Sequence, residues 1–325
     1  MAHYLVTGAA GFIAARVSEM LLDAGHTVYG VDNLNNAYDV RVKEYRLKKL
    51  NARPGFTFKR MDISRWEEVE VLGEESAKFD GVINLAARAG VRSSVIDPWV
   101  FVETNMTGTL NLLELCCRQK INKFILASTS SLYGSHNPMP FKEDADTDHP
   151  LQPYAASKKG AEALCYTYHY LYNMDVTVFR YFTVYGPAGR PDMVMFRFTQ
   201  WINEGRTVQL NGDGEQSRGF TYVDDIARGT ILGLKPLGYE IINLGGHEVI
   251  KINDLIHMLE KRLGRKANVQ YQPLHPADAL ANWANVEKAK DLLGWEPRVS
   301  IDEGVDNLVN WYLKERSWVS QVLTP

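Results

Sequence analysis

The sequence predicts an α/β fold, in which a doubly wound parallel sheet is followed by a smaller mixed α/β domain. Short apolar runs alternate with longer amphipathic stretches, and the runs occupy residues 4–6, 27–31, 56–59, 81–85, 123–127 and 176–179. Strands that alternate with helices form parallel sheets covered on both faces. A turn that contains glycine also follows the first run directly, as at the phosphate site of such sheets.

The first elements form a strand, a tight turn and a helix, an arrangement typical of a Rossmann-like nucleotide site. Residues 7–14 read Thr-Gly-Ala-Ala-Gly-Phe-Ile-Ala. Gly8 allows the turn, Gly11 lets the backbone come close to a pyrophosphate, and Ala14 is small enough for helix-on-strand packing where a third glycine often sits. The helix is expected over residues 12–24, with its end at Gly25.

The second strand ends in an acidic residue. Asp32 lies about twenty residues beyond the glycines, where a carboxylate accepts hydrogen bonds from both hydroxyls of the adenosine ribose. The same carboxylate repels a 2′-phosphate. The pattern therefore predicts NAD rather than NADP as the cofactor.

Tyr154 and Lys158 carry the clearest sign of redox chemistry. They are four residues apart in a stretch, residues 153–172, whose pattern predicts a helix, so the phenol and the ammonium project from one face. We expect the cation to hold the pKa of the phenol down toward working pH, so that the tyrosine acts as a base. An exposed helical pair is the ordinary interpretation of this spacing taken alone. The upstream nucleotide pattern favours a nicotinamide redox enzyme.

The rest of the chain predicts two domains and a dimer. The helical stretches at residues 98–119 and 153–172 are apolar on more than one face, which indicates deep burial or a shared interface, and we expect a homodimer. Beyond residue 181 the pattern changes to short strands, single helices and loops rich in Gly, Pro and Asn. We therefore expect a nucleotide domain at residues 1–180 and a smaller substrate domain at 181–325, with an approximate boundary that segments cross.

The composition argues against some classes of binding partner and bears on the cellular compartment. The 325 residues are 45% hydrophobic and 23% charged with a net charge of −3, which argues against a nucleic-acid or anionic-membrane partner. No apolar run is long enough to span a bilayer and no targeting segment is evident, so a cytoplasmic location is expected. The three cysteines form a poor disulfide framework, and the eight histidines lack metal-ligand spacing, so no metal is expected.

Several segments in one chain order resemble the extended short-chain dehydrogenase/reductase family, and within it the NAD-dependent nucleotide-sugar epimerases. The resemblance covers nearly the whole chain and rests on residues 7–13, 32–34, 62–63, 84–87, 128–134, 154–158 and 180–187. It implies an isomerase that inverts C4 of a UDP-sugar through a 4-keto intermediate, with tightly held NAD that is reduced and reoxidised within one turnover.

The resemblance also implies the roles of individual residues. Tyr154 takes the proton from the sugar 4-hydroxyl, Lys158 binds the nicotinamide ribose and lowers the pKa of the tyrosine, and Thr129 passes the proton between substrate and Tyr154. The cofactor residues that it implies are Gly8, Ala10, Gly11, Phe12, Ile13, Asp32, Asn33, Asp62, Ile63, Leu85, Ala86, Ala87, Lys158 and Tyr181. The implied substrate residues are Arg92, Thr129, Ser130, Ser131, Tyr154, Thr183, Arg190, Arg218 and Asp278.

The residues that follow Thr129 bear on the outcome of the reaction. Related 4,6-dehydratases carry Asp-Glu at that place and the decarboxylases that make UDP-xylose carry a Glu, whereas this chain has Ser130 and Ser131. The run Arg190-Pro-Asp-Met resembles the signature of UDP-glucuronate 4-epimerases, as do Tyr38-Asp39 and residues 89–92 and 139–141. The Arg190 fork with the hydroxyls is expected to cradle a C6 carboxylate. The alternative is that Arg190 pairs with Asp192 on the surface.

The favoured function is therefore the reversible C4 epimerisation of UDP-glucuronate to UDP-galacturonate. Three alternatives stay open: a 4-epimerase of UDP-glucose or UDP-N-acetylglucosamine, a UDP-glucuronate decarboxylase, and a non-catalytic NAD-binding regulator. Two positions depart from the usual family pattern, and their roles are open. Asn285 stands where Asp is more usual, and Arg88 stands where Gln is frequent.

Overall fold

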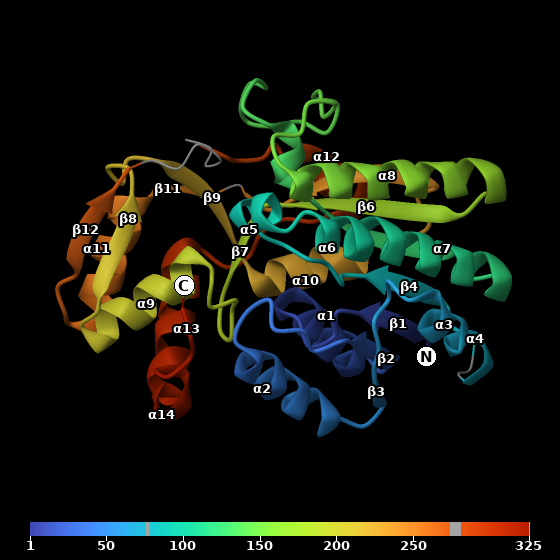
Figure 1. Cartoon of the computed structure of the whole chain (residues 1–325), viewed down its shortest axis with the longest axis horizontal. Coiled ribbons are helices and arrows are strands. Elements are labelled where there is room, and N and C mark those ends of the chain that lie inside the picture. Colours follow the sequence, from blue (N-terminus) through green and yellow to red (C-terminus); the bar gives the residue numbers. More distant parts are fainter. Residues whose placement is uncertain (76–77, 247, 274–280, 325) are drawn as a thin grey trace.

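A parallel sheet of seven strands forms the centre of the molecule (Figure 1). The computed structural model describes residues 1–75, 78–246, 248–273 and 281–324. The strand order is β10-β6-β5-β4-β1-β2-β3, and each neighbouring pair is parallel. The strands are β1 (His3–Thr7), β2 (Thr27–Asp32), β3 (Phe56–Arg60), β4 (Gly81–Asn84), β5 (Lys123–Thr129), β6 (Asp175–Tyr181) and β10 (Tyr239–Leu244). The predicted doubly wound fold is confirmed.

Helices cover both faces of this sheet because the strands are apolar on both sides. Leu5 and Phe124 point into one cluster together with residues of α7 (Gly108–Gln119) and α8 (Pro153–Tyr172). Their chain neighbours Val6 and Ile125 point into another, with α1 (Phe12–Asp23) and α10 (Val223–Leu232). This alternation follows the two-residue period of a strand. Figure 1 shows α7 and α8 on one side of the sheet, and α1, α2 (Val40–Asn51) and α10 on the other.

The stretch predicted as one helix over residues 98–119 is interrupted. It consists of α6 (Trp99–Val102), a π-helical turn (Glu103–Thr107) and α7, and α5 (Val91–Ile96) precedes it. The π turn aims the buried Asn105 side chain at the loop after β4, where its amide bonds both the N–H and the carbonyl of Arg88 at 3.0 Å. Such turns recur at functional sites.

The second lobe contains two small sheets. One has the strand order β11 (Glu248–Lys251), β9 (Ser217–Tyr222), β7 (Thr183–Tyr185), and the other pairs β12 (Asn268–Gln272) with β8 (Thr207–Asn211). The helices of this half are α9 (Val194–Glu204), α11 (Ile252–Leu263), α12 (Glu287–Leu293), α13 (Ile301–Lys314) and α14 (Arg316–Val319). The segment of α10 and β10 returns to the large sheet. The division near residue 180 stays a prediction.

Two short helices, α3 (Trp66–Glu70) and α4 (Leu72–Glu75), complete the first half. Among the described residues, none of the helices has the length and apolar character that crossing a membrane requires.

Candidate active site at the carboxyl ends of the strands

The glycine turn after β1 has no side chain at Gly8 or Gly11, so its own backbone can come close to a ligand. Gly8 has a φ of 68°, and a Cβ there would lie 2.8 Å from the Cα of Ala86 in the loop after β4. Gly11 caps α1 without a side-chain hydrogen bond. The first N–H groups of the helix therefore face the turn, which is the arrangement that binds a diphosphate. The turn fits a dinucleotide.

The ends of β2 and β3 bring the predicted ribose and adenine residues together. Asn33 donates to Asp62 at 2.9 Å, and the Asp32 carboxylate accepts from the backbone of Leu34 at 2.8 Å. Burial acts to raise the pKa of Asp62, but hydrogen bonds from Asn33 and Ser64 outweigh it and lower that pKa. The Asp62 carboxylate therefore stays ionised and can accept hydrogen bonds from a ligand's donors.

Lys43 is a charged neighbour of Asp32 that the sequence did not indicate. Its ammonium lies 3.6 Å from the Asp32 carboxylate, and both side chains are 6% exposed. Lys43 also donates to Asn35, which accepts a second hydrogen bond from Arg88 at 3.2 Å. The role of Arg88, open from the sequence, is therefore to link the loop after β4 to the segment after β2.

The other predicted cofactor residues line the same strand ends. Ala10 and Phe12 flank Gly11, and the half-buried Ile13 packs on the core below. The Ala86 N–H donates to the Thr7 hydroxyl at 3.1 Å, which ties the loop of Leu85, Ala86 and Ala87 to β1. Ile63 is held from the opposite side, where its carbonyl accepts from Asn111 at 2.8 Å.

The side chain of Tyr181 points into the core and not toward the cofactor site that was predicted for it. The hydroxyl is bonded to Thr230 at 2.8 Å inside the core, and the ring stacks on Phe179. The residue is 7% exposed. Only its backbone, at the carboxyl end of β6, faces the strand-end site, because the side chain belongs to the core cluster on the α1 and α10 face.

The helix α8 carries Tyr154 and Lys158, as predicted. Its first residue is Pro153, which suits the first helical position. Lys158 is 2% exposed and donates to the carbonyl of Ala127 on β5 at 2.8 Å. Burial lowers the pKa of Lys158 to about 8. This ammonium is thus fixed against the end of the strand, one helical turn from the phenol.

Two side chains act on the pKa of Tyr154, and the predicted effect of Lys158 on that pKa stays a prediction. Burial raises the pKa of Tyr154, and the hydrogen bond between the phenol and Thr129 and the charge of Arg190 oppose that rise. The Lys158 ammonium is directed at the Ala127 carbonyl. Thr129 and Arg190 are the side chains that lower the pKa of the phenol.

Ser130 and Ser131 form a turn of hydroxyls immediately after Thr129. The Thr129 hydroxyl accepts from the Ser131 N–H and donates to the Ser131 hydroxyl, both at 3.2 Å. The Ser130 hydroxyl accepts from Asn282 at 3.2 Å. Asn282 comes from the second lobe, a long-range contact that no local sequence pattern indicates.

Arg190 does pair with Asp192, at 2.5 Å, but the pair is not an exposed one. The two side chains are 24% and 26% exposed. Arg190 also donates to the carbonyl of Ala89 at 3.2 Å and lies over the Tyr38 ring, 5.9 Å from its centre. These contacts hold the Arg190 guanidinium among Asp192, Ala89 and Tyr38, and its charge lowers the pKa of Tyr154.

The remaining predicted substrate residues lie toward the second lobe. Arg92 on α5 donates to the Asn211 side chain at the end of β8, with the shorter of two contacts at 2.5 Å. Arg218 lies on β9 and Thr183 begins the neighbouring β7. Asp278 lies outside the described residues. Asn285 bonds the N–H of Glu287 at 3.0 Å, so its place is the start of α12.

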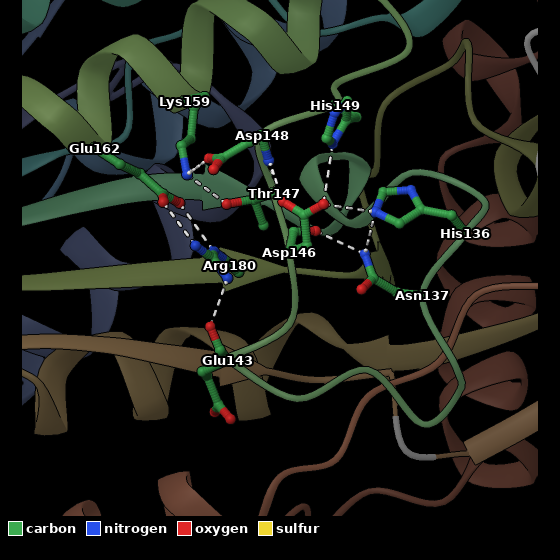
Figure 2. A network of polar contacts seen from close by, with 10 residues as sticks. All are labelled: His136, Asn137, Glu143, Asp146, Thr147, Asp148, His149, Lys159, Glu162 and Arg180. Atoms are coloured by element: carbon green, nitrogen blue, oxygen red, sulfur yellow. Dashed lines mark hydrogen bonds and ion pairs between the residues drawn. The ribbon is translucent and has the colours of Figure 1, made fainter.

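A polar network joins the site to the loop of residues 134–149 (Figure 2). The buried Arg180 pairs with Glu162 of α8 at 2.8 Å and donates to the carbonyl of Glu143 at 3.0 Å. Lys159, the neighbour of Lys158, pairs with Asp148 at 3.0 Å. These contacts fasten the loop that follows the hydroxyl turn to α8.

The same loop assembles three possible metal ligands that their sequence spacing did not suggest. His136 and His149 each contact one oxygen of Asp146, at 3.1 and 3.0 Å, as Figure 2 shows. All three residues are exposed. The backbone of Asp148 and the His149 ring lower the pKa of Asp146 to about 2, so the histidines face a carboxylate.

Comparison with known proteins settles the family. The model of the NAD dependent epimerase/dehydratase family matches residues 4–245. The chain belongs to that family. It is 56% identical to the UDP-glucuronate 4-epimerase of Thermodesulfobacterium geofontis over 312 residues, which cover 96% of this chain and 96% of that protein. The family resemblance and the NAD dependence predicted from the sequence are confirmed.

Solved structures of this epimerase/dehydratase family share the fold. The crystal structure of UDP-glucuronic acid 4-epimerase from Bacillus cereus, in complex with UDP-glucuronic acid and NAD, gives a TM-score of 0.90 at 36% identity and covers 96% of this chain and 99% of that one. UDP-glucose 4-epimerase from Thermotoga maritima with UDP-glucose gives 0.89 at 32% identity, with coverage of 97% and 99%.

Proposed function

We propose that this protein interconverts UDP-glucuronate and UDP-galacturonate by inverting C4 of the sugar. The observation that carries the proposal is that Arg190 and Thr129, the first residue of the hydroxyl turn, both act on the Tyr154 phenol. An arginine among hydroxyls suits a carboxylate at C6. The 56% identity to a protein named UDP-glucuronate 4-epimerase supports the same substrate.

The residues of the first half are suited to holding NAD. The Gly8 turn and the open start of α1 take the diphosphate, and Asp32 takes the adenosine ribose. Asp62 and Ile63 frame the adenine. Bound NAD supplies the chemistry of hydride removal from C4 of the sugar and of its return.

The protein's own groups handle the proton. Tyr154 takes the proton from the 4-hydroxyl, and Thr129, hydrogen-bonded to the phenol, relays it between the substrate oxygen and Tyr154. Lys158 holds the nicotinamide ribose. Because burial already lowers the pKa of Lys158 to about 8, the buried ammonium gains from any hydrogen-bond acceptor placed beside it.

The carboxylate must be restrained after the oxidation. The 4-keto form of a hexuronate is a β-keto acid, which loses carbon dioxide when the carboxylate stands perpendicular to the carbonyl plane. Arg190, Ser130 and Ser131 hold the carboxylate in an unreactive orientation while the sugar ring turns over. Arg92 and Arg218 bind the diphosphate of the nucleotide, with Thr183 and Asp278 near the substrate.

The alternatives are weaker for specific reasons. A neutral-sugar 4-epimerase shares the fold and the Tyr154 chemistry, but its substrate has no C6 carboxylate for Arg190 and the hydroxyl turn to bind. The decarboxylase lacks its acidic residue after Thr129, where Ser130 and Ser131 stand. A non-catalytic regulator has no need of Thr129, Tyr154 and Lys158 together.

We also propose a homodimer, with α8 and α6 at its interface. Large apolar side chains stand exposed on these neighbouring helices and on the adjoining segments; they are Val95, Ile96, Trp99, Val102, Leu151, Tyr166, Tyr170, Leu171 and Tyr172. Exposed apolar side chains that gather on neighbouring helices are typical of a protein interface. The expected cytoplasmic location stays a prediction that suits three free thiols in the described chain.

The test is overnight incubation with UDP-glucuronate and, separately, with UDP-glucose, followed by proton NMR of the products. UDP-galacturonate from the acid, with no product from the neutral sugar, is the expected result. UDP-galactose from UDP-glucose, or a UDP-pentose from the acid, would assign the chain to one of the alternatives.

A further inference from the structure

Arg46 on α2 connects two turns of the site and has no part in the mechanism above. The residue is 4% exposed. Its guanidinium donates to the carbonyl of Ala10 in the glycine turn at 3.0 Å. It also donates to the carbonyls of Ala188, at 2.7 and 2.9 Å, and of Gly189, at 3.0 Å. One side chain thus joins the nucleotide turn to the turn that immediately precedes Arg190.

The turn that accepts these hydrogen bonds from Arg46 has a strained backbone. Ala188 has a φ of 53°, a left-handed conformation that is unfavourable for a residue with a Cβ. Strained residues persist where surrounding contacts fix them, and they gather at functional sites. The two hydrogen bonds from Arg46 to the Ala188 carbonyl are contacts of this kind, since a planar fork fixes direction as well as distance.

Tyr38 joins Arg46 to Arg190 a second time. Its hydroxyl accepts from Arg46 at 2.9 Å. The guanidinium carbons of Arg46 and Arg190 lie 5.7 and 5.9 Å from the centre of the Tyr38 ring, within reach of the ring's negative face. The position of Arg190 therefore depends on Arg46 through the Ala188 turn and through this ring.

The charge of Arg46 is not balanced by a carboxylate. Among the described residues, no acidic side chain lies within ion-pair distance of it, and carbonyls and the Phe12 and Tyr38 rings surround the guanidinium. A buried cation of this kind is unfavourable by itself.

We propose that Arg46 is a positioning residue for recognition of the sugar carboxylate. It fixes the Ala188 turn and the Tyr38 ring against the glycine turn, and it thereby sets the place of the Arg190 guanidinium. This inference rests on the proposed function, because it assigns Arg46 to the carboxylate of UDP-glucuronate and not to the UDP portion.

The test compares affinities in the NAD-loaded protein. All variants carry Tyr154→Phe so that turnover does not obscure binding, and the dissociation constants of UDP-glucuronate and UDP-glucose are measured by calorimetry. The variants are Arg46→Met, Arg46→Lys, Tyr38→Leu and Tyr38→Phe. The control is Arg228→Met, which removes another arginine fork, bonded to Asp225 and to the Glu296 carbonyl outside the site.

We expect Arg46→Met to weaken UDP-glucuronate binding about tenfold, the size of one charge-assisted hydrogen bond, and to leave UDP-glucose binding within about twofold. Arg46→Lys keeps the charge but loses the fork, so its loss should be intermediate. Adding Ala188→Gly, which takes the left-handed turn without strain, should restore part of the loss in Arg46→Met. A purely structural role predicts equal losses for both sugars and no rescue.

The two Tyr38 variants still test the proposal if the Arg46→Met variant does not fold. Tyr38→Leu removes the ring and should lower the preference for UDP-glucuronate, whereas Tyr38→Phe keeps the ring and should stay close to the parent. In Arg46→Lys and Tyr38→Leu, the ratio of the UDP-glucuronate and UDP-glucose affinities is compared with that of the Arg228→Met control. An unchanged ratio in both variants overturns the role of Arg46. Absence of UDP-galacturonate production by the wild-type chain overturns the proposed function instead, whatever the ratios show.

Discussion

At the scale of single residues, the chemistry centres on a phenol that the fold makes hard to ionise. Burial raises the pKa of Tyr154, and Thr129 and Arg190 oppose that rise. Arg190 therefore has two parts in the proposed reaction. It binds the sugar carboxylate, and it favours the phenolate that accepts the proton.

Tyr154→Phe removes the proton acceptor and leaves the nucleotide turn intact. We expect kcat to fall by about 10³-fold or more, in keeping with the loss of a general base, while the protein keeps its NAD. Steady-state kinetics and the absorbance of NAD released on denaturation measure the two quantities. Substantial residual turnover would mean that another group is the base.

Arg190 links substrate binding to pH dependence. Its charge lowers the pKa of Tyr154, so removing it raises that pKa. In Arg190→Ala the ascending limb of the kcat profile should move to higher pH, and kcat/KM for UDP-glucuronate should fall about 10- to 100-fold. Arg190→Lys keeps a charge there and should keep the limb near its wild-type position. Unshifted limbs in both variants would separate Arg190 from Tyr154.

A site residue could be predicted from the sequence where the pattern that indicates it is local along the chain. Gly8, Asp32, Tyr154 and Lys158 have fixed spacings along the chain, so the sequence indicated them. Asn282 reaches Ser130 across 152 positions, and no periodicity reports such a contact. Lys43 and Arg46 lie three residues apart on the buried face of a largely polar helix, and their residue types give no indication of that burial.

At the scale of elements, the strand, turn and helix of residues 3–23 position the nucleotide site. Their pattern was predictable because strand period, glycine and helix start are all local. The π turn in the 98–119 stretch was not, because its cause is the contact of the Asn105 side chain with the loop after β4 and with Ser157, at 2.9 Å. Apolar spacing is the same on both sides of that turn.

Gly8 and Gly25 form a matched pair for testing the turn. Both have a left-handed φ, of 68° and 80°, but a Cβ on Gly8 meets the Ala86 backbone at 2.8 Å, whereas one on Gly25 meets nothing within 4 Å. Gly25→Ala should cost about 1 kcal/mol of unfolding free energy from backbone strain alone. Gly8→Ala should cost about 2 kcal/mol or more and should release NAD. Chemical denaturation and nucleotide content measure both, and equal behaviour of the two variants would contradict a close-packed turn.

At the scale of the whole molecule, two features depend on contacts far apart in the sequence. The return of β10 to the edge of the large sheet, beside β6, could not be predicted, since a short apolar strand carries no sign of its partner. The exposed apolar side chains of α8 could be anticipated, because that helix is apolar on more than one face.

The proposed dimer predicts an effect confined to one surface. Leu171→Glu on α8 places a charge where 60% of the leucine is exposed, and the wild-type dimer should become a monomer by light scattering. Leu323→Glu, at a leucine 73% exposed near the carboxyl terminus, is the control and should stay dimeric. A monomeric wild-type chain, or a dimer unaffected by Leu171→Glu, would rule out this interface.

The most direct test of the account follows the hydrogen at C4. UDP-glucuronate labelled with deuterium at C4 is incubated with the protein in ordinary water, and the product is examined by NMR. The account predicts UDP-galacturonate that keeps its deuterium at C4 and its carboxylate, because the hydrogen removed in the first half of the reaction is the one returned in the second. Ordinary hydrogen at C4, or a UDP-pentose as the main product, would contradict it.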